Sequence, residues 1–314
     1  MNPHVTFRQL QVFESVGRHL SYTRAAEELH LTQPAVSMQV KQLEHVLGHE
    51  LFDHIGRRVY LTDAGEILLH YSRRIAAELG DAKQALDDLK GVDGGRLRIA
   101  VVTTVNYFAT RLLAAFCRAH PRVNVTLEVT NRNSVIKLLE ENATDIVLMG
   151  QPPDSLELTA APFMDNPLVI IAPPSHPLVG RRRVRLEALR EEAFVIRESG
   201  SGTRAAMERF FQEKGLAPRT RIEMSSNEAI KQSVEAGLGL GLVSAHTVEL
   251  EIAAGRLELL DVESIPILKR WFVVHHKRKR LSSTARAFVD HVMNATREID
   301  RTTRRRRRSR HGSR

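Results

Sequence analysis

A row of polar side chains near the N-terminus has the chemistry and the spacing to read DNA bases. Gln33, Ser37 and Lys41 lie four residues apart, with Met38 beside them, so in a helix they form one edge. A glutamine amide bonds adenine twice, a serine hydroxyl bonds a base or a phosphate, and a lysine suits phosphate. This edge predicts a helix that enters the major groove of double-stranded DNA.

Four further segments are rich in hydroxyl, amide and backbone N–H groups, which suit a small anion. Each follows a predicted strand or opens a predicted helix, where free N–H groups and the helix dipole favour negative charge. The segments are Thr103–Asn106, Thr130–Ser134, Ser199–Arg204 and Ser225–Asn227. The candidate ligand contacts within them are Thr103, Thr104, Asn106, Thr130, Asn131, Arg132, Ser199, Gly200, Ser201, Gly202, Thr203, Arg204, Ser226 and Asn227.

The segment from Ser199 to Arg204 is the strongest of these four candidates. Gly200 and Gly202 allow the backbone to approach a ligand, and Arg204 can clamp an anionic oxygen. Each of the four segments is also compatible with an ordinary capped turn. Arg132 and Lys231 can face a cleft or remain solvated charges.

Three short helices are expected to position the DNA-reading edge. The first begins at Phe7, the second is capped by Ser21, and the third is capped by Thr32 with Pro34 in its first turn. The turn before Thr32 is short, and His30 replaces the glycine that such bends favour, because histidine tolerates left-handed backbone angles better than most residues. Aliphatic residues form the buried side of the third helix at Val36, Val40, Leu43 and Leu47.

A β-hairpin wing is predicted after the third helix. The strands Leu51–Asp53 and Val59–Leu61 flank a turn that contains glycine, and Arg57 and Arg58 lie at its tip. Arginines there can enter a minor groove or hold phosphates. The candidate DNA contacts are Ser21, Thr23, Thr32, Gln33, Pro34, Ser37, Met38, Lys41, Arg57 and Arg58. A plain three-helix bundle with a solvated polar face is the alternative.

A long helix is predicted to begin at Thr62. Apolar or small residues repeat every seven positions in two registers, which is the pattern of a helix that pairs with a second copy. One register is Leu61, Leu68, Ile75, Ala82 and Leu89, and the other is Gly65, Ser72, Leu79 and Leu86. Such a dimer places two DNA-reading helices on successive major grooves. Packing against its own chain is the alternative; the helix is expected to end at Gly91, before a hinge at Gly94 and Gly95.

Strand-like and helix-like segments alternate from residue 96 to residue 300, which indicates an α/β architecture with largely parallel sheets. The expected strands include 97–102, 123–129, 146–149, 168–172, 194–197, 240–243 and 271–275, and a closing helix covers 282–298. The expected domains are a DNA-binding domain at 1–62, a linker or dimerisation helix at 63–91, an effector-binding domain at 92–300 and a disordered Arg-rich tail at 301–314.

The net charge of +9 does not by itself indicate nucleic-acid binding. Residues 301–314 contain eight of the 46 basic residues, which leaves 38 basic against 37 acidic residues elsewhere. The tail can add non-specific phosphate binding or be inert. A single cysteine, Cys117, allows no internal disulfide, and neither a signal peptide nor a membrane-spanning segment is recognisable, so we expect a cytoplasmic protein.

No catalytic motif is evident, so the sequence does not predict an enzyme, a bound cofactor or a metal. The chain lacks the nucleophile-elbow, phosphate-loop and zinc-protease patterns. His45 and His49 are four residues apart, but no third zinc ligand accompanies them. Function is therefore expected to be binding and regulation.

The run SYTRAAEELHLTQPAVSMQVKQLEHVLGHELFDHIGRRVYLTDAGE, residues 21–66, resembles the signature of LysR-type transcriptional regulators. The resemblance continues to about residue 298 and implies a winged helix-turn-helix, a dimerisation helix and a two-lobed effector domain like that of periplasmic binding proteins. It implies lobe I at about 92–165 and 270–300, lobe II at about 166–269, and crossings near 165–172 and 262–272. Relatives often carry a polar or basic residue at the position of Met38. Since a methionine side chain is apolar, we expect Met38 to make an apolar contact, such as with a thymine methyl group, in place of a hydrogen bond.

Four segments are more closely similar to the CbbR branch of that family: VVTTVNYFATRLLAAFCRAHP, NPLVIIAPPSHPL, RESGSGTRAAMERFF and MSSNEAIKQSVEAGLGLGLVSAHTVELE. This resemblance implies control of carbon-fixation operons of the Calvin cycle, including RuBisCO genes. The implied effectors are a phosphorylated metabolite, such as ribulose bisphosphate or phosphoglycolate, or NADPH. The implied partners are promoter DNA, further copies of the chain in a dimer of dimers, and RNA polymerase.

Three other hypotheses remain open from the sequence. A regulator of the same family can control another pathway, such as inorganic carbon uptake or aromatic catabolism. A solute-binding protein can be built on similar lobes, although a signal peptide is then expected. A metabolic enzyme with a DNA-binding appendage is the third, and the missing catalytic motifs disfavour it.

Overall fold

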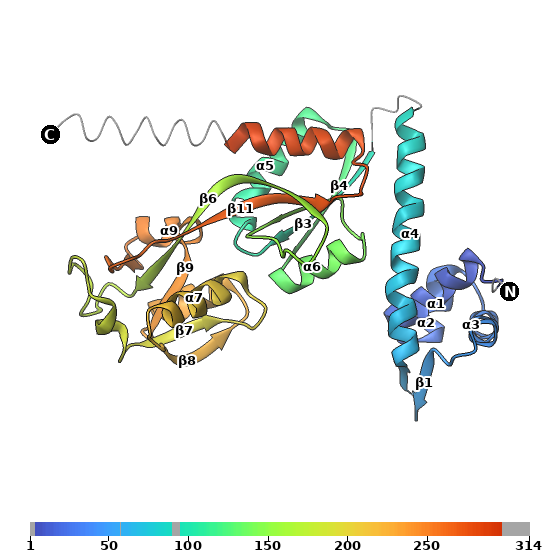
Figure 1. Ribbon diagram of the computed structural model, residues 1–314, viewed down its shortest axis with the longest axis horizontal. Helices are drawn as coiled ribbons and strands as arrows, with labels where there is room; N and C mark the ends of the chain where they lie inside the picture. The colour runs from blue at the N-terminus through green and yellow to red at the C-terminus, as the bar shows by residue number, and fades with distance from the viewer. Residues whose placement is uncertain (1–3, 57, 90–94, 297–314) are drawn as a thin grey trace. The chain divides into compact units, whose positions relative to one another are not determined.

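The computed structural model describes residues 4–56, 58–89 and 95–296 (Figure 1). The chain divides into an N-terminal unit up to residue 90 and a C-terminal unit from residue 91, with residues 141–143 grouped with the first unit. Four features predicted from the sequence lie outside the described residues: Arg57, the helix end at Gly91, the hinge residue Gly94 and the Arg-rich tail. Gly95 is the first residue of a strand. Within the described part of the chain, no helix is long and apolar enough to cross a membrane.

Local capping explains the boundaries of the first three helices, α1 (Phe7–His19), α2 (Tyr22–Leu29) and α3 (Gln33–Leu47). The Ser21 hydroxyl accepts a hydrogen bond from the Arg24 N–H, and the Thr32 hydroxyl accepts one from the Ala35 N–H, as predicted. His30 ends α2 with φ of 53°, which confirms its left-handed conformation. The three helices share one core, formed by Val12, Phe13, Val16, Ala25, Ala26, Val36, Val40 and Leu43 among others.

The predicted wing is present as an antiparallel hairpin of β1 (Phe52–Ile55) and β2 (Arg58–Leu61). This pair of strands rules out a plain three-helix bundle. The Thr62 hydroxyl donates to the Glu50 carbonyl and accepts from the Gly65 N–H, so it ties the hairpin to the helix that follows. A Cβ atom on Gly65 would lie 2.1 Å from the Leu51 carbonyl oxygen, so only glycine allows this close approach.

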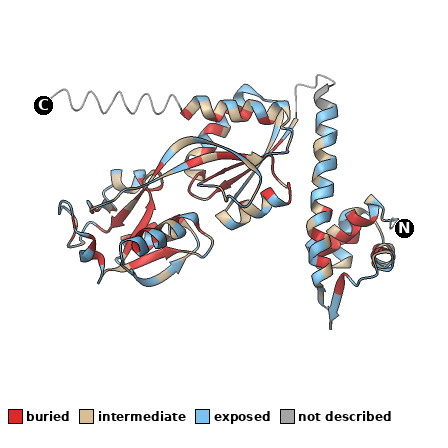
Figure 2. Ribbon diagram, viewed as in Figure 1, coloured by how far each residue is buried: buried red, intermediate tan, exposed pale blue. Residues whose placement is uncertain are grey.

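The predicted heptad pattern fits only part of the long helix α4 (Asp63–Leu89). Its first two turns pack against the head, the unit formed by α1, α2, α3 and the hairpin: Ala64 and Leu68 contact the core, and Leu69 is buried. Among the residues of α4 whose burial is described, the exposed large apolar ones are Ile67, Tyr71, Ile75, Leu79 and Leu86. Figure 2 shows mostly exposed residues along the part of α4 beyond the head. The heptad prediction is wrong at the start of α4. There, Gly65 and Leu68 contact the head, while Ile67 and Tyr71 are exposed.

The C-terminal unit is built on one sheet with the strand order β4-β3-β5-β11-β6-β9-β7-β8, and β10 pairs with β6. The elements of the first part are β3 (Gly95–Val102), α5 (Asn106–Ala119), β4 (Val123–Thr130), α6 (Arg132–Glu140), β5 (Ile146–Met149) and β6 (Leu158–Ala172). They are followed by η1 (Leu186–Leu189), β7 (Ala193–Arg197), α7 (Gly202–Glu213), β8 (Arg219–Met224), α8 (Asn227–Glu235) and β9 (Leu240–Ser244). The last elements are η2 (Ala245–Thr247), α9 (Glu249–Ala253), β10 (Glu258–Leu259), β11 (Ile267–His276) and a helix over residues 283–296.

The prediction of largely parallel sheets is correct only at the two ends of this sheet. Strands β3, β4 and β5 pair in parallel, and so do β7, β8 and β9. Between them, β6 and β11 pair antiparallel with each other and with their neighbours, because the chain crosses between the lobes once in each direction. Strand β8 was not predicted from the sequence. It lies at the edge of the sheet, and its polar and apolar residues alternate only weakly.

Each lobe has its own hydrophobic core, which appears as buried strands in Figure 2. In lobe I, β3, β5 and α5 pack with Trp271 and Phe288. In lobe II, Phe194 of β7 packs with Phe211 of α7 on one side of the sheet, and Ile230 and Val234 of α8 cover the other. The two cores hold the loops at the ends of β3, β4 and β7 in fixed positions.

Candidate DNA-binding surface and ligand cavity

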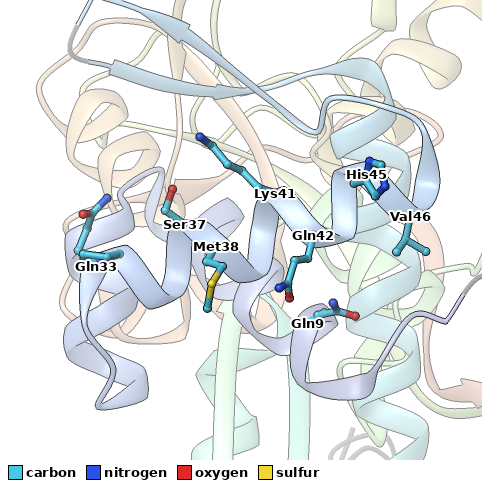
Figure 3. Close-up of a pocket in the computed structure, with 9 residues that line it drawn as sticks. Gln9, Gln33, Ser37, Met38, Lys41, Gln42, His45 and Val46 are labelled. Atoms are coloured by element: carbon cyan, nitrogen blue, oxygen red, sulfur yellow. The ribbon is translucent and has the colours of Figure 1, made fainter.

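The predicted DNA-reading residues of α3 lie on one exposed surface. Figure 3 shows Gln33, Ser37, Met38 and Lys41 along the outer side of the helix. With Pro34 they line a shallow hollow of about 720 Å³, while Val36, Val40 and Leu43 of the same helix are buried in the core. Met38 is 54% exposed although it is apolar, which suits a contact with a partner.

The hollow includes residues that were not among the predicted DNA contacts. Gln42 and His45 extend it along α3, and both continue a four-residue spacing that starts at Met38 and Lys41. Gln9 joins it from α1, where its side-chain oxygen also accepts hydrogen bonds from the Thr6 N–H and hydroxyl. The spacing could have identified Gln42 and His45, whereas only the tertiary fold brings Gln9 there.

The remaining candidate DNA contacts have different positions. Ser21 and Thr32 cap α2 and α3, so each hydroxyl already accepts a backbone hydrogen bond. Thr23 is exposed on α2, and Arg58 is exposed at the start of β2. A DNA contact by any of these residues stays a prediction.

A cavity of about 830 Å³ lies between the two lobes of the C-terminal unit. The ends of three elements meet there: Thr103 and Thr104 follow β3, Asn131 and Arg132 open α6, and Ser201, Gly202 and Thr203 open α7. These seven residues are predicted ligand contacts that the fold brings together. The crossing strands supply the rest of the wall, including Asn166, Leu168, Leu268, Trp271 and Phe272.

The cavity wall carries an excess of positive charge. Among its described lining residues, Arg132, Arg197, Arg209, Lys269 and Arg270 are cationic and Asp154 is the one carboxylate. Arg197 and Arg270 form ion pairs with Glu198 and Asp165, so the excess comes from the other three cations. The first N–H groups of α7 add donors and the positive end of the helix dipole, and the Ser201 side chain does not cap them. Asn166 is 7% exposed, and its Oδ1 atom has no hydrogen-bond partner among the described residues. The site therefore favours a small anion that also carries a hydrogen-bond donor.

Seven predicted ligand contacts do not line the cavity: Asn106, Thr130, Ser199, Gly200, Arg204, Ser226 and Asn227. Ser226 caps α8, and Gly200 has φ of 85° and packs against Asn133. Arg204 forms ion pairs with Glu208 and Glu223 and donates to the Arg197 carbonyl, so its guanidinium already has partners, and it does not line the cavity. The structure therefore does not support Arg204 as the clamp on an anion in this cavity.

Arg197 is a buried cation of the cavity wall whose guanidinium has several hydrogen-bond partners. It was not among the ligand contacts predicted from the sequence. It is 3% exposed and forms an ion pair with Glu198. Its Nη1 donates to Asn227 Oδ1 at 2.6 Å, and its Nη2 donates to Thr103 Oγ1 of the other lobe at 3.2 Å. The only signal in the sequence is a charged residue at the end of the apolar strand AFVIR.

Both units match models of one protein family. Residues 7–66 match the bacterial regulatory helix-turn-helix protein model of the lysR family, and residues 90–297 match the LysR substrate binding domain. The chain belongs to the LysR family of transcriptional regulators. The resemblance read from residues 21–66 is thereby confirmed, as is the fold class of a winged helix-turn-helix, a long helix and an α/β effector domain.

Two curated LysR relatives and one solved structure are closely similar to this chain. A RuBisCO operon transcriptional regulator of Allochromatium vinosum is 55% identical over 92% of this chain and 96% of that protein. A protein of the same description from Acidithiobacillus ferrooxidans is 43% identical over 93% of this chain and 95% of that protein. The CcmR regulatory domain of Synechocystis PCC6803, in complex with 2-PG, is 42% identical, with a TM-score of 0.63 over 64% of this chain and 97% of that domain. This LysR protein is thus a transcriptional regulator and not an enzyme.

Proposed function

We propose that this LysR regulator binds promoter DNA of carbon-fixation operons and responds to a small phosphorylated metabolite. The operon assignment is supported by the two RuBisCO operon regulators, which are similar over more than nine-tenths of both chains. The observation that carries the effector class is the cavity between the lobes, where five cationic side chains, two of them ion-paired with Glu198 and Asp165, share the wall with one carboxylate. The related regulatory domain in complex with 2-PG supports 2-phosphoglycolate as a ligand of this chemistry.

In this proposal the head reads a half-site and the cavity reports the metabolite. Gln33 and Ser37 contact base edges, Met38 contacts a thymine methyl group, and Lys41 and Arg58 hold phosphates. Binding of the anion shifts the arrangement of the lobes and so changes how the heads engage DNA. The exposed apolar residues of α4 support pairing with a second copy, and a dimer of dimers extends that pairing. A contact with RNA polymerase stays a prediction.

The decisive experiment is a titration of the full chain with candidate effectors, read both by calorimetry and by retention of the DNA that flanks its gene. We expect saturable binding of 2-phosphoglycolate or ribulose bisphosphate and a changed DNA complex. NADPH is the third ligand to test. An aromatic acid that binds while the phosphorylated compounds do not would favour a regulator of another pathway. Specific DNA retention without any response to phosphorylated compounds would reject the effector proposal.

A smaller effect is expected from Lys41, which is exposed on α3. Replacing Lys41 by Gln should lower affinity for operator and unrelated DNA alike, because a phosphate contact carries no sequence information. It should also reduce the slope of log K against log salt concentration by about 0.9, the value for one lost phosphate contact. Binding isotherms at several salt concentrations measure that slope. A loss confined to the operator would show instead that Lys41 reads bases.

A further inference from the structure

A group of polar contacts joins the two lobes beside the ligand cavity. The segment that follows β3 in lobe I, with Thr103 and Tyr107, lies against the first turns of α8 in lobe II, with Asn227, Glu228 and Lys231. Arg197 links Thr103 to Asn227, and it lines the cavity. Tyr107, Glu228 and Lys231 form the neighbouring link and do not line the cavity.

The second link is made by three groups with complementary chemistry. The Tyr107 hydroxyl donates to Glu228 Oε1, and Lys231 Nζ lies 2.8 Å from the same carboxylate oxygen. Lys231 Nζ also lies 5.0 Å from the centre of the Tyr107 ring, within the range of a cation–π interaction. A phenol and an ammonium group from opposite lobes thus meet at one carboxylate.

The hydrogen bonds and ion pairs of Lys231 are all to residues of lobe II, so it can act as a fixed support for Tyr107. It is 5% exposed, and its Nζ donates to the Thr247 carbonyl at 3.1 Å and to Glu251 Oε1 at 2.8 Å. The sequence analysis allowed Lys231 to face the cleft, but the structure places it in this buried ion group. Its charge is used to hold Glu228 and the Tyr107 ring.

The ionisation of the two other groups favours the same contact. Burial, and then the hydrogen bond to Glu228, raise the pKa of Tyr107, so the hydroxyl keeps its proton at neutral pH. Burial of Glu228 opposes ionisation, but hydrogen bonds from Lys231 and Tyr107 outweigh it and lower the pKa of Glu228. A neutral phenol therefore donates to a charged carboxylate, which is stronger than a hydrogen bond between neutral groups.

We propose that Tyr107, Glu228 and Lys231 form an interlobe clasp that sets the affinity of the regulator for its effector without contacting it. The apparent dissociation constant equals the intrinsic constant divided by the fraction of molecules in the binding-competent arrangement. The clasp favours the arrangement in which both lobes face the cavity, so it raises that fraction. Tyr107 and Glu228 are thus positioning residues for the cavity. The inference concerns the site of the proposed function and rests on that proposal.

The test compares the full-length chain with three variants in calorimetric titrations with 2-phosphoglycolate. Tyr107→Phe removes the hydroxyl and keeps the ring beside Lys231, while Glu228→Ala removes the shared acceptor. Each should weaken binding by about 3- to 10-fold, which lies within the range for the net contribution of one typical hydrogen bond. The double variant should be no weaker than the weaker single one, since both remove one interaction. Additive effects or unchanged affinity would overturn the proposal.

Glu235→Gln is the matched control. Glu235 belongs to the same helix and forms an ion pair with Arg256, but both residues are in lobe II. This variant should bind 2-phosphoglycolate as the unmodified chain does. A loss of affinity equal to that of Glu228→Ala would assign the effect to general weakening of α8 and would overturn the clasp.

Hydrogen exchange without ligand separates the clasp from the effector assignment. Tyr107→Phe should increase amide exchange on both sides of the contact, in residues 103–112 and 226–236, whereas Glu235→Gln should leave 103–112 unchanged. If the unmodified chain fails to bind 2-phosphoglycolate, the proposed effector is wrong. The exchange result then still shows whether the clasp joins the two lobes. Unchanged exchange at 103–112 in Tyr107→Phe would overturn it.

Discussion

Replacing Gln33 and Ser37 together by alanine is expected to weaken operator binding by about 100-fold or more, because base contacts are each worth roughly 1–3 kcal/mol. Both side chains line the exposed hollow of α3, and neither packs into the core of the head. Fold stability should therefore change little. Affinity for unrelated DNA should also change little, since phosphate contacts dominate there. Competition binding with operator and unrelated duplexes measures the two affinities separately.

Gln11→Ala is the control for this double variant. Gln11 is an exposed glutamine of the same head, on α1, but it does not line the hollow. Its replacement should leave operator affinity unchanged. Unchanged operator affinity in the Gln33 and Ser37 variant itself would mean that another surface reads the DNA, and the assignment of α3 would fail.

Gly202→Glu is expected to reduce binding of 2-phosphoglycolate by about 100-fold or to abolish it. Gly202 is the first residue of α7 and lines the cavity, so the new carboxylate would lie where the helix end and Arg132 favour an anion. It would pair with the cations and repel a phosphate group. The magnitude corresponds to about 2.7 kcal/mol, within the cost of placing like charges together in a partly desolvated site.

Gly202→Ala separates charge from size at this position. Gly202 is not among the glycines with positive φ, and a Cβ atom there would contact only the Arg132 Cδ atom, at an ordinary 3.5 Å. The alanine variant should therefore bind 2-phosphoglycolate within about two-fold of the unmodified chain. Calorimetry on both variants checks the pair. Equal binding by Gly202→Glu and Gly202→Ala would place the anion outside this end of the cavity.

The head could be predicted closely because its signals are local. Ser21, Thr32 and Pro34 act within one helical turn, and the aliphatic stripe of α3 repeats with the helical period. The wing follows from two short runs around a turn. The buried face at the start of α4 was harder to predict, because packing against the head decides which of its apolar residues are covered. Gly65 contacts Leu51 for that reason, although its position also fits a heptad.

The cavity could be predicted only in part. Strand ends and helix starts are visible in the sequence, so Thr103, Arg132 and the residues from Ser201 to Thr203 were found. The crossing strands contribute Asn166 and Trp271, which look like ordinary strand residues until two distant segments pair. Arg197 and Arg204 show the same limit, because partners distant in the sequence decide which guanidinium reaches the cavity. Those partners are Thr103 and Asn227 for Arg197, and Glu223 for Arg204.

The two long strands that join the lobes restrict the kind of motion available to the sensor. Strand β11 pairs with β6 from Ile267 to His276, and the register slips once, between Trp271 and Phe272. Paired strands keep their backbone hydrogen bonds over a range of right-handed twist, and a β-bulge bends the strand and increases the twist locally. Trp271 and Phe272 also line the cavity, so a ligand bound there would contact β11 at this irregularity. If a metabolite binds in this cavity, we therefore expect the lobes to respond through a change in the twist of the sheet, without the ordering or melting of a loop.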